Sequence, residues 1–310
     1  MLNPQIDAFM AKWTSEWASL KPGATLPERK AHFEGVAANM ALPKPEDVDD
    51  ATEHHIESAA GPVRVRVYRH TSGGTQDCLI YAHGGGFVQG SPETHADITS
   101  RIASWNKQTV VSVDYYLLPD HPFPTAFLQM CDVTRWCRAN ADLLGIDPER
   151  IAVGGDSAGG NLAAATALAM KDEFPFIAQL LIYPVTEFDL ERPSMIANAN
   201  APLLQTKGMA ANNRMFVGGE ENEHMLRDDP RCAPYVADNH SGCAPAFVAV
   251  AENDPLYDSG VIYAEKLKAA GVPVVLEKGD GLIHGYLRSM EYCDDAQAKL
   301  RKMTDWLAAR

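Results

Sequence analysis

Short β-rich segments alternate with helical patterns along most of the chain after about residue 50, and this alternation limits the folds that the chain can adopt. We expect eight strands, at residues 52–58, 63–68, 78–82, 110–114, 151–154, 178–183, 246–250 and 274–277. Helical patterns separate the later strands, at about 96–106, 124–140, 158–171, 257–270 and 292–309. The alternation predicts an α/β fold with a mostly parallel sheet flanked by helices. The first two strands lack a helix between them, so we expect them to pair antiparallel at one edge.

Two segments depart from this alternation, and we expect them to form a helical cap. Residues 1–45 have apolar residues at helical spacing, interrupted by Pro22 and Pro27, which predicts two helices. Residues 187–244 contain no convincing strand but include a helical stretch around 207–225. We therefore expect cap helices in 1–45 and one α/β domain over 46–310 that carries a cap insertion at about 187–244.

Charge and cysteine content exclude several classes of partner. The 41 acidic and 27 basic residues give a net charge of −14, which disfavours binding to nucleic acid or to anionic membranes. The six cysteines form no C-x-x-C pair and no Cys/His cluster, so we expect no structural zinc. We expect a cytoplasmic protein, because the first residues do not have a signal-peptide pattern and no long apolar run follows.

A serine lies within the sequence Gly-Asp-Ser-Ala-Gly, residues 155–159, directly after an expected strand and before an expected helix. This setting is typical of a nucleophile elbow, in which Ser157 is exposed at a sharp strand-to-helix turn. The motif alone has about 0.07 chance occurrences in a chain of this composition. On this evidence alone, a glycine-rich turn with an inert serine stays an alternative.

A second motif, His83-Gly-Gly-Gly86, ends the expected strand at 78–82 and has only about 0.004 chance occurrences. Consecutive glycines can bring backbone N–H groups close to a developing oxyanion, as in lipases and esterases. The alternative is a flexible turn without function.

A nucleophilic serine needs a base and a group that orients the base, and both must come from the C-terminal half of the chain. Asp254 follows the strand at 246–250, and His284 lies on the loop after the last strand. Catalytic groups of parallel sheets gather outside the carboxyl ends of the strands. Asp258 and Glu252 are alternatives to Asp254, which we prefer because it is nearest the strand end. Six other histidines lack such a position: His54, His55, His95, His121, His224 and His240.

Taken together, these motifs resemble those of the hormone-sensitive-lipase-like carboxylesterases, bacterial family IV, of the α/β-hydrolase superfamily. The resemblance covers about residues 50–310 and includes His83–Phe87, Val113–Tyr115, His121–Pro124, Gly155–Asn161, Asp254–Leu256 and His284–Gly285. It implies that Ser157 is the nucleophile, His284 the general base and acid, and Asp254 the residue that orients His284. It also implies an oxyanion hole formed by the N–H groups of Gly85, Gly86 and Ala158, with His83 and Gly84 supporting the glycine loop.

The function that this resemblance implies is hydrolysis of short- to medium-chain carboxylic esters through an acyl-enzyme, without a cofactor or metal. The partner would be a small-molecule ester, and a homodimer is possible. An amide, carbamate or lactone hydrolase would use the same residues. A non-catalytic small-molecule receptor is a further alternative, against which the presence of His284 argues.

Two residues depart from the family pattern. Tyr116 stands where relatives usually have arginine, which puts an ion pair there in doubt, and Tyr286 stands where they often have phenylalanine. We expect Tyr286 either to pack in the interior or to alter substrate preference. Six apolar side chains of the cap insertion are expected either to line the acyl pocket or to pack within the cap. They are Met195, Leu203, Leu204, Met209, Met215 and Phe216.

Overall fold

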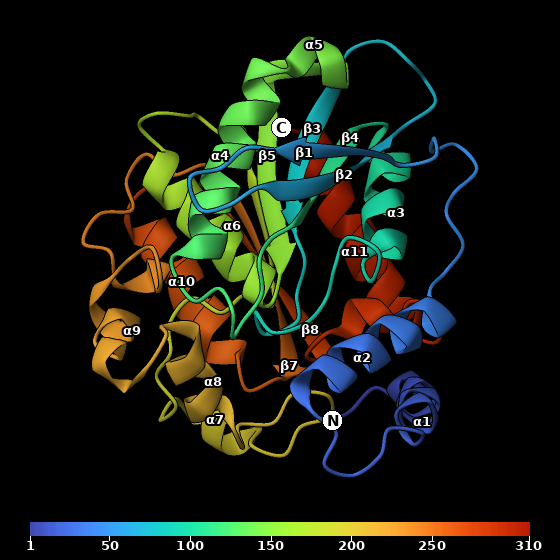
Figure 1. The fold of residues 1–310 in the computed structure, drawn as a ribbon, viewed down its shortest axis with the longest axis vertical. Coiled ribbons are helices and arrows are strands. Elements are labelled where there is room, and N and C mark those ends of the chain that lie inside the picture. Colours follow the sequence, from blue (N-terminus) through green and yellow to red (C-terminus); the bar gives the residue numbers. More distant parts are fainter.

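The computed structural model describes all 310 residues, which form one central sheet of eight strands (Figure 1). In order across the sheet, the strands are β1 (Thr52–Ile56), β2 (Val63–Arg69), β4 (Thr109–Asp114), β3 (Gln76–Ala82), β5 (Ile146–Asp156), β6 (Gln179–Ile182), β7 (Ala246–Asn253) and β8 (Val274–Ile283). Strand β2 pairs antiparallel with both β1 and β4, and all the other pairs are parallel. The predicted α/β fold, its eight strands and its antiparallel edge are confirmed.

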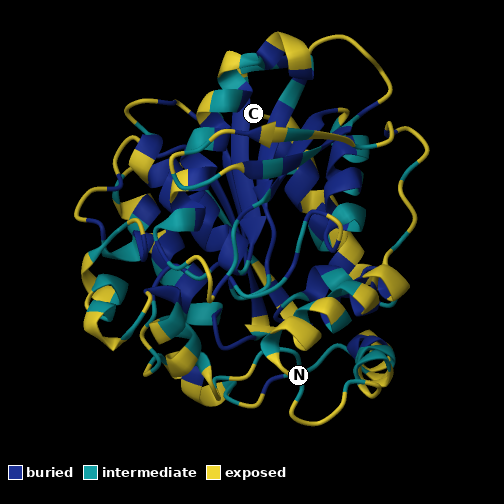
Figure 2. Ribbon diagram, in the orientation of Figure 1, coloured by how far each residue is buried: buried dark blue, intermediate teal, exposed yellow.

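Helices cover both faces of the sheet, as the alternating sequence pattern predicts. One face packs against α3 (Ala96–Asn106) and α11 (Asp294–Ala308), and the other packs against α4 (Thr125–Ala139), α6 (Ala158–Met170) and α10 (Tyr257–Ala269). Successive residues of β3 point to opposite faces, so Leu79 and Tyr81 belong to the first core, and Cys78 and Ile80 to the second. Figure 2 shows the buried sheet between these layers. Helix α5 (Ala141–Leu144) is a single turn, too short for a periodic sequence signal.

Helix α6 begins at the end of β5 and lies unusually close to the sheet. Nearly all of its residues are buried, which explains why alanine and glycine dominate its sequence. A Cβ atom at Gly159 would overlap the carbonyl oxygen of Ala82 at the end of β3. Glycine at this position therefore lets the first turn of α6 approach the carboxyl end of β3.

The segments expected to form a cap are helical. Helices α1 (Gln5–Trp17), α2 (Leu26–Met40), α7 (Pro193–Ala197) and α8 (Met209–Phe216) lie together beyond one end of the sheet (Figure 1). Residues 187–244 also include α9 (Met225–Asp228) and the 3-10 turns η1 (Glu220–Asn222) and η2 (Pro234–Val236), but no strand. The exposed outer faces of these helices are visible in Figure 2.

The N-terminal helices are held by specific local and long-range contacts. Helix α2 starts at a capping box, in which the N–H of Glu28 donates to Thr25 Oγ1 and the N–H of Thr25 donates to the Glu28 carboxylate. Pro27, expected to interrupt the helical pattern, instead lies in the first turn of α2, where proline is tolerated. At the start of α11, Asp294 and Asp295 accept hydrogen bonds from Gln5 and Asn3, at 3.0 and 2.7 Å. No helix has both the length and the hydropathy needed to cross a bilayer.

Candidate active site

Four side chains with catalytic chemistry follow directly after four strands of the sheet. His83 follows β3, Ser157 follows β5, Asp254 follows β7 and His284 follows β8. These strands are parallel and lie within one continuous part of the sheet, so their carboxyl ends meet at the same edge. The topology therefore collects residues that are far apart in the sequence at the place where parallel sheets carry their active sites.

Three of these side chains form a continuous hydrogen-bonded chain. Ser157 Oγ lies 2.8 Å from His284 Nε2, and His284 Nδ1 lies 2.8 Å from Asp254 Oδ2. The other carboxylate oxygen of Asp254 accepts a hydrogen bond from the N–H of Leu256 at 2.8 Å. Because the buried carboxylate can only accept, it places the imidazole proton on Nδ1, and Nε2 then presents its lone pair to the serine hydroxyl.

The two alternative carboxylates make other contacts. Asp258 Oδ2 accepts a hydrogen bond from the N–H of Ser194 at the start of α7. Glu252 Oε2 accepts one from the N–H of Gly281 in β8. Neither is bonded to His284, so the structure brings Asp254, and not its neighbours, to the imidazole.

The backbone of Ser157 has an unusual conformation, with φ +55° and ψ −117°. A residue with a Cβ atom rarely adopts a positive φ, and such positions cost about 1–3 kcal/mol. The strain is balanced by hydrogen bonds on both sides. The N–H of Ser157 donates to Ile182 O in β6, and its carbonyl accepts from the N–H of Asn161 in α6. The turn therefore holds the hydroxyl group exposed above the sheet, as the elbow motif predicts.

The glycine loop after β3 lies beside this serine. The N–H groups of Gly85, Gly86 and Ala158 donate to no acceptor within the protein. A Cβ atom at Gly85, which has a φ of +131°, would overlap the carbonyl oxygen of Gln89, so only glycine fits there. Gly84, Gly85 and Gly86 line the same cavity as Ser157 and His284.

His83 packs beneath the loop. Its ring is fully buried and stacks on Tyr115, with ring centroids 4.3 Å apart. The hydroxyl of Tyr115 donates to the carbonyl of His83, and His83 Nδ1 donates to the carbonyl of Gly84. Burial lowers the pKa of His83 to about 3, so its imidazole is neutral at ordinary pH. These contacts are structural and involve no proton exchange.

Comparison with known proteins agrees with this geometry. Residues 79–288 match a family described as alpha/beta hydrolase fold. The chain belongs to this family. It is 42% identical over 238 residues to an esterase of Mycobacterium tuberculosis, covering 75% of this chain and 73% of the relative. It is 33% identical over 317 residues to an ethyl acetate hydrolase of Pseudomonas putida, covering 96% of each.

The structural comparison gives the same result over the whole chain. The crystal structure of a mutant alpha/beta hydrolase enzyme from the metagenome of Lake Arreo, Spain, superposes with a TM-score of 0.92 at 31% sequence identity. The superposition covers 100% of this chain and 98% of that one. With the motifs around Ser157 and His83, these findings place the α/β-hydrolase described here among the hormone-sensitive-lipase-like carboxylesterases.

Sequence analysis of this hydrolase missed a buried network behind the serine. Asp156 Oδ1 accepts hydrogen bonds of 2.9 Å from the hydroxyl of Tyr81 and from the N–H of Gly84, and lies 3.4 Å from His95 Nε2. Arg288 Nη2 donates to the same nitrogen of His95 at 2.9 Å. A guanidinium can only donate, so His95 Nε2 is the acceptor and its ring proton is on Nδ1, 2.9 Å from Thr94 Oγ1.

This network keeps Asp156 ionised and fixes the glycine loop. Burial alone would raise the pKa of Asp156, but its interactions with His95, the positive charge of Arg288 and the hydrogen bond from Tyr81 outweigh it and hold the pKa well below its usual range. His95, which sequence analysis had set aside as unremarkable, is fully buried at this site. Asp156 lies within the elbow motif and could have been noticed, whereas no pattern singles out His95 or Arg288.

A cavity of about 430 Å³ opens above the serine of this hydrolase, and the cap supplies much of its wall. Of the six apolar cap residues considered from the sequence, four line the cavity: Met195, Leu203, Leu204 and Met209. The other two do not. Phe216 instead stacks on Phe87, with ring centroids 4.2 Å apart, and Met215 packs against the core beneath the cap. No three His, Cys, Asp or Glu side chains are grouped in a way that could hold a metal ion.

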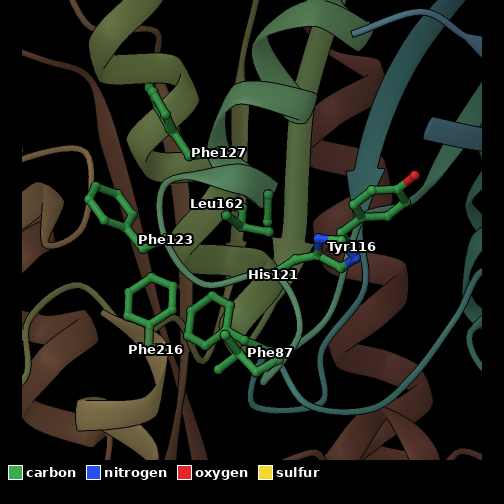
Figure 3. A pocket seen from close by; sticks show the side chains of 9 residues that line it. Phe87, Tyr116, His121, Phe123, Phe127, Leu162 and Phe216 are labelled. Carbon is green, nitrogen blue, oxygen red and sulfur yellow. The ribbon is translucent and has the colours of Figure 1, made fainter. Parts of the chain in front are cut away.

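Tyr116, the first departure from the family pattern, lines a small aromatic pocket of about 10 Å³ next to this cavity (Figure 3). Tyr116 packs against His121 there, with ring centroids 4.2 Å apart, so an aromatic pair occupies the place of the arginine. Phe87 lines both spaces, whereas Phe216 lines only the small pocket. The small pocket has room for about one water-sized group.

The second departure, Tyr286, is a packing residue. Its ring is fully buried and contacts Tyr183 edge-on, with centroids 5.2 Å apart, and it does not line the cavity. Burial raises the pKa of its hydroxyl well above the usual range, and this hydroxyl has no hydrogen-bond partner. Of the two roles considered, the structure supports packing.

Proposed function

We propose that this hydrolase is a serine carboxylesterase that cleaves short- to medium-chain carboxylic esters through an acyl-enzyme. The observation that carries the proposal is the hydrogen-bonded chain from Asp254 through His284 to Ser157, which ends beside three unpaired backbone N–H groups. The cavity volume of about 430 Å³ is within the range of small-molecule sites. The names of the two relatives, an esterase and an ethyl acetate hydrolase, support the same reaction.

In the first half of the reaction, Ser157 Oγ attacks the ester carbonyl carbon while His284 Nε2 takes the hydroxyl proton. Asp254 stabilises the imidazolium through Nδ1. The carbonyl oxygen becomes an oxyanion, which accepts hydrogen bonds from the N–H groups of Gly85, Gly86 and Ala158. The intermediate then expels the alcohol, which receives its proton from His284, and the acyl group stays on Ser157.

The second half repeats these steps with water. His284 Nε2 removes a proton from water as the water oxygen attacks the acyl carbon. The same three N–H groups stabilise the second oxyanion, and collapse of this intermediate releases the carboxylic acid and returns the proton to Ser157 Oγ. The cycle consumes one ester and one water and yields one alcohol and one acid.

The experiment that tests this function is hydrolysis of p-nitrophenyl esters from acetate to decanoate. We expect fast turnover by the wild type and a loss of roughly 10⁴-fold or more in kcat for Ser157→Ala. Ser241→Ala is the matched control, because Ser241 is an exposed loop serine. Turnover that survives Ser157→Ala would show that this serine is not the nucleophile. If the folded wild type hydrolysed no ester, an amide, carbamate or lactone substrate would be favoured instead.

A further inference from the structure

Three positively charged side chains line the cavity above Ser157: Arg29 in α2, Lys207 between α7 and α8, and Arg288 in the 3-10 turn η3 (Tyr286–Ser289). None of them lies within 4.0 Å of a carboxylate oxygen, whereas many arginines elsewhere in the molecule are ion-paired. The paired ones are Arg64, Arg66, Arg135, Arg138, Arg150, Arg192, Arg214, Arg231 and Arg301.

The two carboxylates that line the cavity are already hydrogen-bonded or ion-paired within the protein. Asp156 is held by Tyr81 and by the N–H of Gly84. Glu187 accepts a hydrogen bond from the N–H of Asp189 and lies 3.4 Å from Arg192 Nε. The ionised Asp156 offsets part of the Arg288 charge, so Arg29 and Lys207 leave the cavity lining with a net positive charge, in a chain whose net charge is −14.

Two of the cations lie near aromatic rings of the N-terminal helices, Arg288 over Phe33 and Arg29 over Trp17. Arg29 and Phe33 are four residues apart in α2, so they share a face of that helix, and both line the cavity. The Arg288 guanidinium lies over the Phe33 ring, 4.9 Å from its centroid. The α2 side of the cavity thus combines an apolar ring with the guanidinium groups of Arg29 and Arg288.

The hydrogen bonds of Arg288 leave several N–H donors of its guanidinium free. Its guanidinium donates to the carbonyl of Thr94 at 3.2 Å and to the neutral ring of His95 at 2.9 Å. An arginine has five N–H donors, and both acceptors here are uncharged. The remaining donors can therefore bind an anion in the cavity.

We propose that Arg29, Lys207 and Arg288 bind an anionic group of the substrate, so that the preferred esters carry a carboxylate in addition to the scissile ester bond. This inference rests on the proposed esterase function and narrows its substrate class to half-esters of dicarboxylic acids or acyl esters of hydroxy acids. Guanidinium groups pair well with carboxylates, and a cavity lined by one sign of charge concentrates ligands of the opposite sign. The net charge of the whole chain is negative and repels anions. The proposed preference for anionic esters therefore comes from the three cations of the cavity and not from the overall charge.

The test compares esters that have the same shape and differ only in charge. One pair is 4-acetoxybenzoate and 4-acetoxybenzamide, which places the charge on the alcohol part. The other is monomethyl adipate and the methyl ester of adipic acid monoamide, which places it on the acyl part. We expect a higher kcat/KM for the charged ester in at least one pair, mainly through a lower KM, because the carboxylate is remote from the reacting atoms. The preference should shrink in 0.5 M NaCl.

Variants then test which cations cause the preference for charged esters. In R29Q/K207Q the ratio of kcat/KM between charged and neutral esters should fall about fivefold, since each exposed ion pair contributes only a small factor. Arg288 also donates a hydrogen bond to His95, so R288Q could lower activity on every ester. Its effect is therefore judged only by the ratio of kcat/KM between charged and neutral esters, because a general loss of activity cancels in that ratio. Arg227→Gln is the matched control, because it removes one unpaired charge from α9, outside the cavity lining.

Three outcomes would overturn the inference. They are equal kcat/KM values within both wild-type pairs, a preference that survives both R29Q/K207Q and R288Q, or a preference that Arg227→Gln reduces equally. In each of these cases continued hydrolysis of the neutral esters would leave the proposed esterase function intact. Failure to hydrolyse any ester, charged or neutral, would instead contradict the proposed function.

Discussion

The carboxylate of Asp156 accepts a hydrogen bond of 2.9 Å from the backbone N–H of Gly84. This contact joins the turn at Ser157 to the glycine loop, so that the two parts of the proposed oxyanion hole are held at a fixed separation. Asp156 precedes the nucleophile in the chain and contacts neither His284 nor Asp254. We therefore expect its effect on the reaction to be one of positioning.

Substitution of Asp156 should consequently lower kcat more than it raises KM. We expect a loss of about 10- to 100-fold in kcat for Asp156→Ala, because poorly aligned N–H donors stabilise the oxyanion less. Asp156→Asn keeps an oxygen acceptor for the N–H of Gly84, so its kcat should fall less than that of Asp156→Ala. Steady-state kinetics on one p-nitrophenyl ester measures both values. A change confined to KM would contradict the positioning role.

The neighbouring carboxylates around β7 provide a test of the triad. Asp254→Asn should lower kcat by about 10⁴-fold, because an amide cannot hold the imidazole proton on Nδ1. Asp258→Asn and Glu252→Gln should lose less than tenfold, since those carboxylates bind backbone N–H groups away from His284. The three variants are compared by kcat on the same ester. If Asp258→Asn were the most damaging, the assignment of Asp254 would be wrong.

The hydrogen bond between His284 and Ser157 predicts how the rate depends on pH. Protonated imidazole has no lone pair at Nε2 and cannot accept the serine proton, so kcat/KM should fall about tenfold per pH unit at the acid end of the profile. The profile is measured between pH 4 and 9, with circular dichroism as a check that the protein stays folded. A rate that stayed constant down to about pH 4 would exclude His284 as the base.

His83 should make stability depend on pH. Burial lowers its pKa to about 3 in the folded protein, against an ordinary value of 6.5. Between these values the unfolded chain binds one more proton, so stability falls as the pH is lowered, by up to about 1.4 kcal/mol per unit. Urea unfolding at pH 5 to 7.5 should show a shallower dependence for His83→Gln than for the wild type. Identical slopes would mean that His83 is not neutral in the fold.

Two helical glycines should respond in opposite ways to alanine. A Cβ atom at Gly35, which is exposed in α2, meets nothing within 4 Å, so Gly35→Ala should raise the free energy of unfolding by about 0.5–1 kcal/mol. At Gly159 the added Cβ atom would overlap Ala82 O, so Gly159→Ala should lower the free energy of unfolding by about 1–3 kcal/mol. Thermal or urea unfolding measures both. A stable Gly159→Ala protein would show that α6 can move away from β3.

The sequence predicted the order of strands and helices well because apolar runs and periodicity are local. Strand ends were predicted less well. We expected the last strand to end at residue 277, but β8 continues to Ile283, because its polar and glycine residues pair with β7, as in Val250 with Lys278. That pairing is a tertiary property, and the strand's own composition does not indicate it.

The same distinction applies to the site. Ser157, Asp254 and His284 lie next to recognisable strands or motifs, and the structure brings them into one hydrogen-bonded chain. His95 and Arg288 are 193 residues apart and meet only because the start of α3 packs beside η3. Interactions of that kind leave no pattern in one sequence. Likewise, only the fold decides which apolar cap residues reach the cavity.

The hydrogen bonds that attach the N-terminal segment to α11 can form only after the C-terminal end of the chain has been synthesised. The hydrogen-bond partners of Gln5 and Asn3, in the first turn of α11, lie 289 and 292 residues further along the chain. At roughly 5–20 residues per second, a ribosome would take about 15–60 s to make them after the first helix has emerged. Until then Trp13, which lines the cavity, lacks this anchor on its helix. The part of the cavity wall that α1 supplies is thus among the last parts of the newly made protein to be fixed in place.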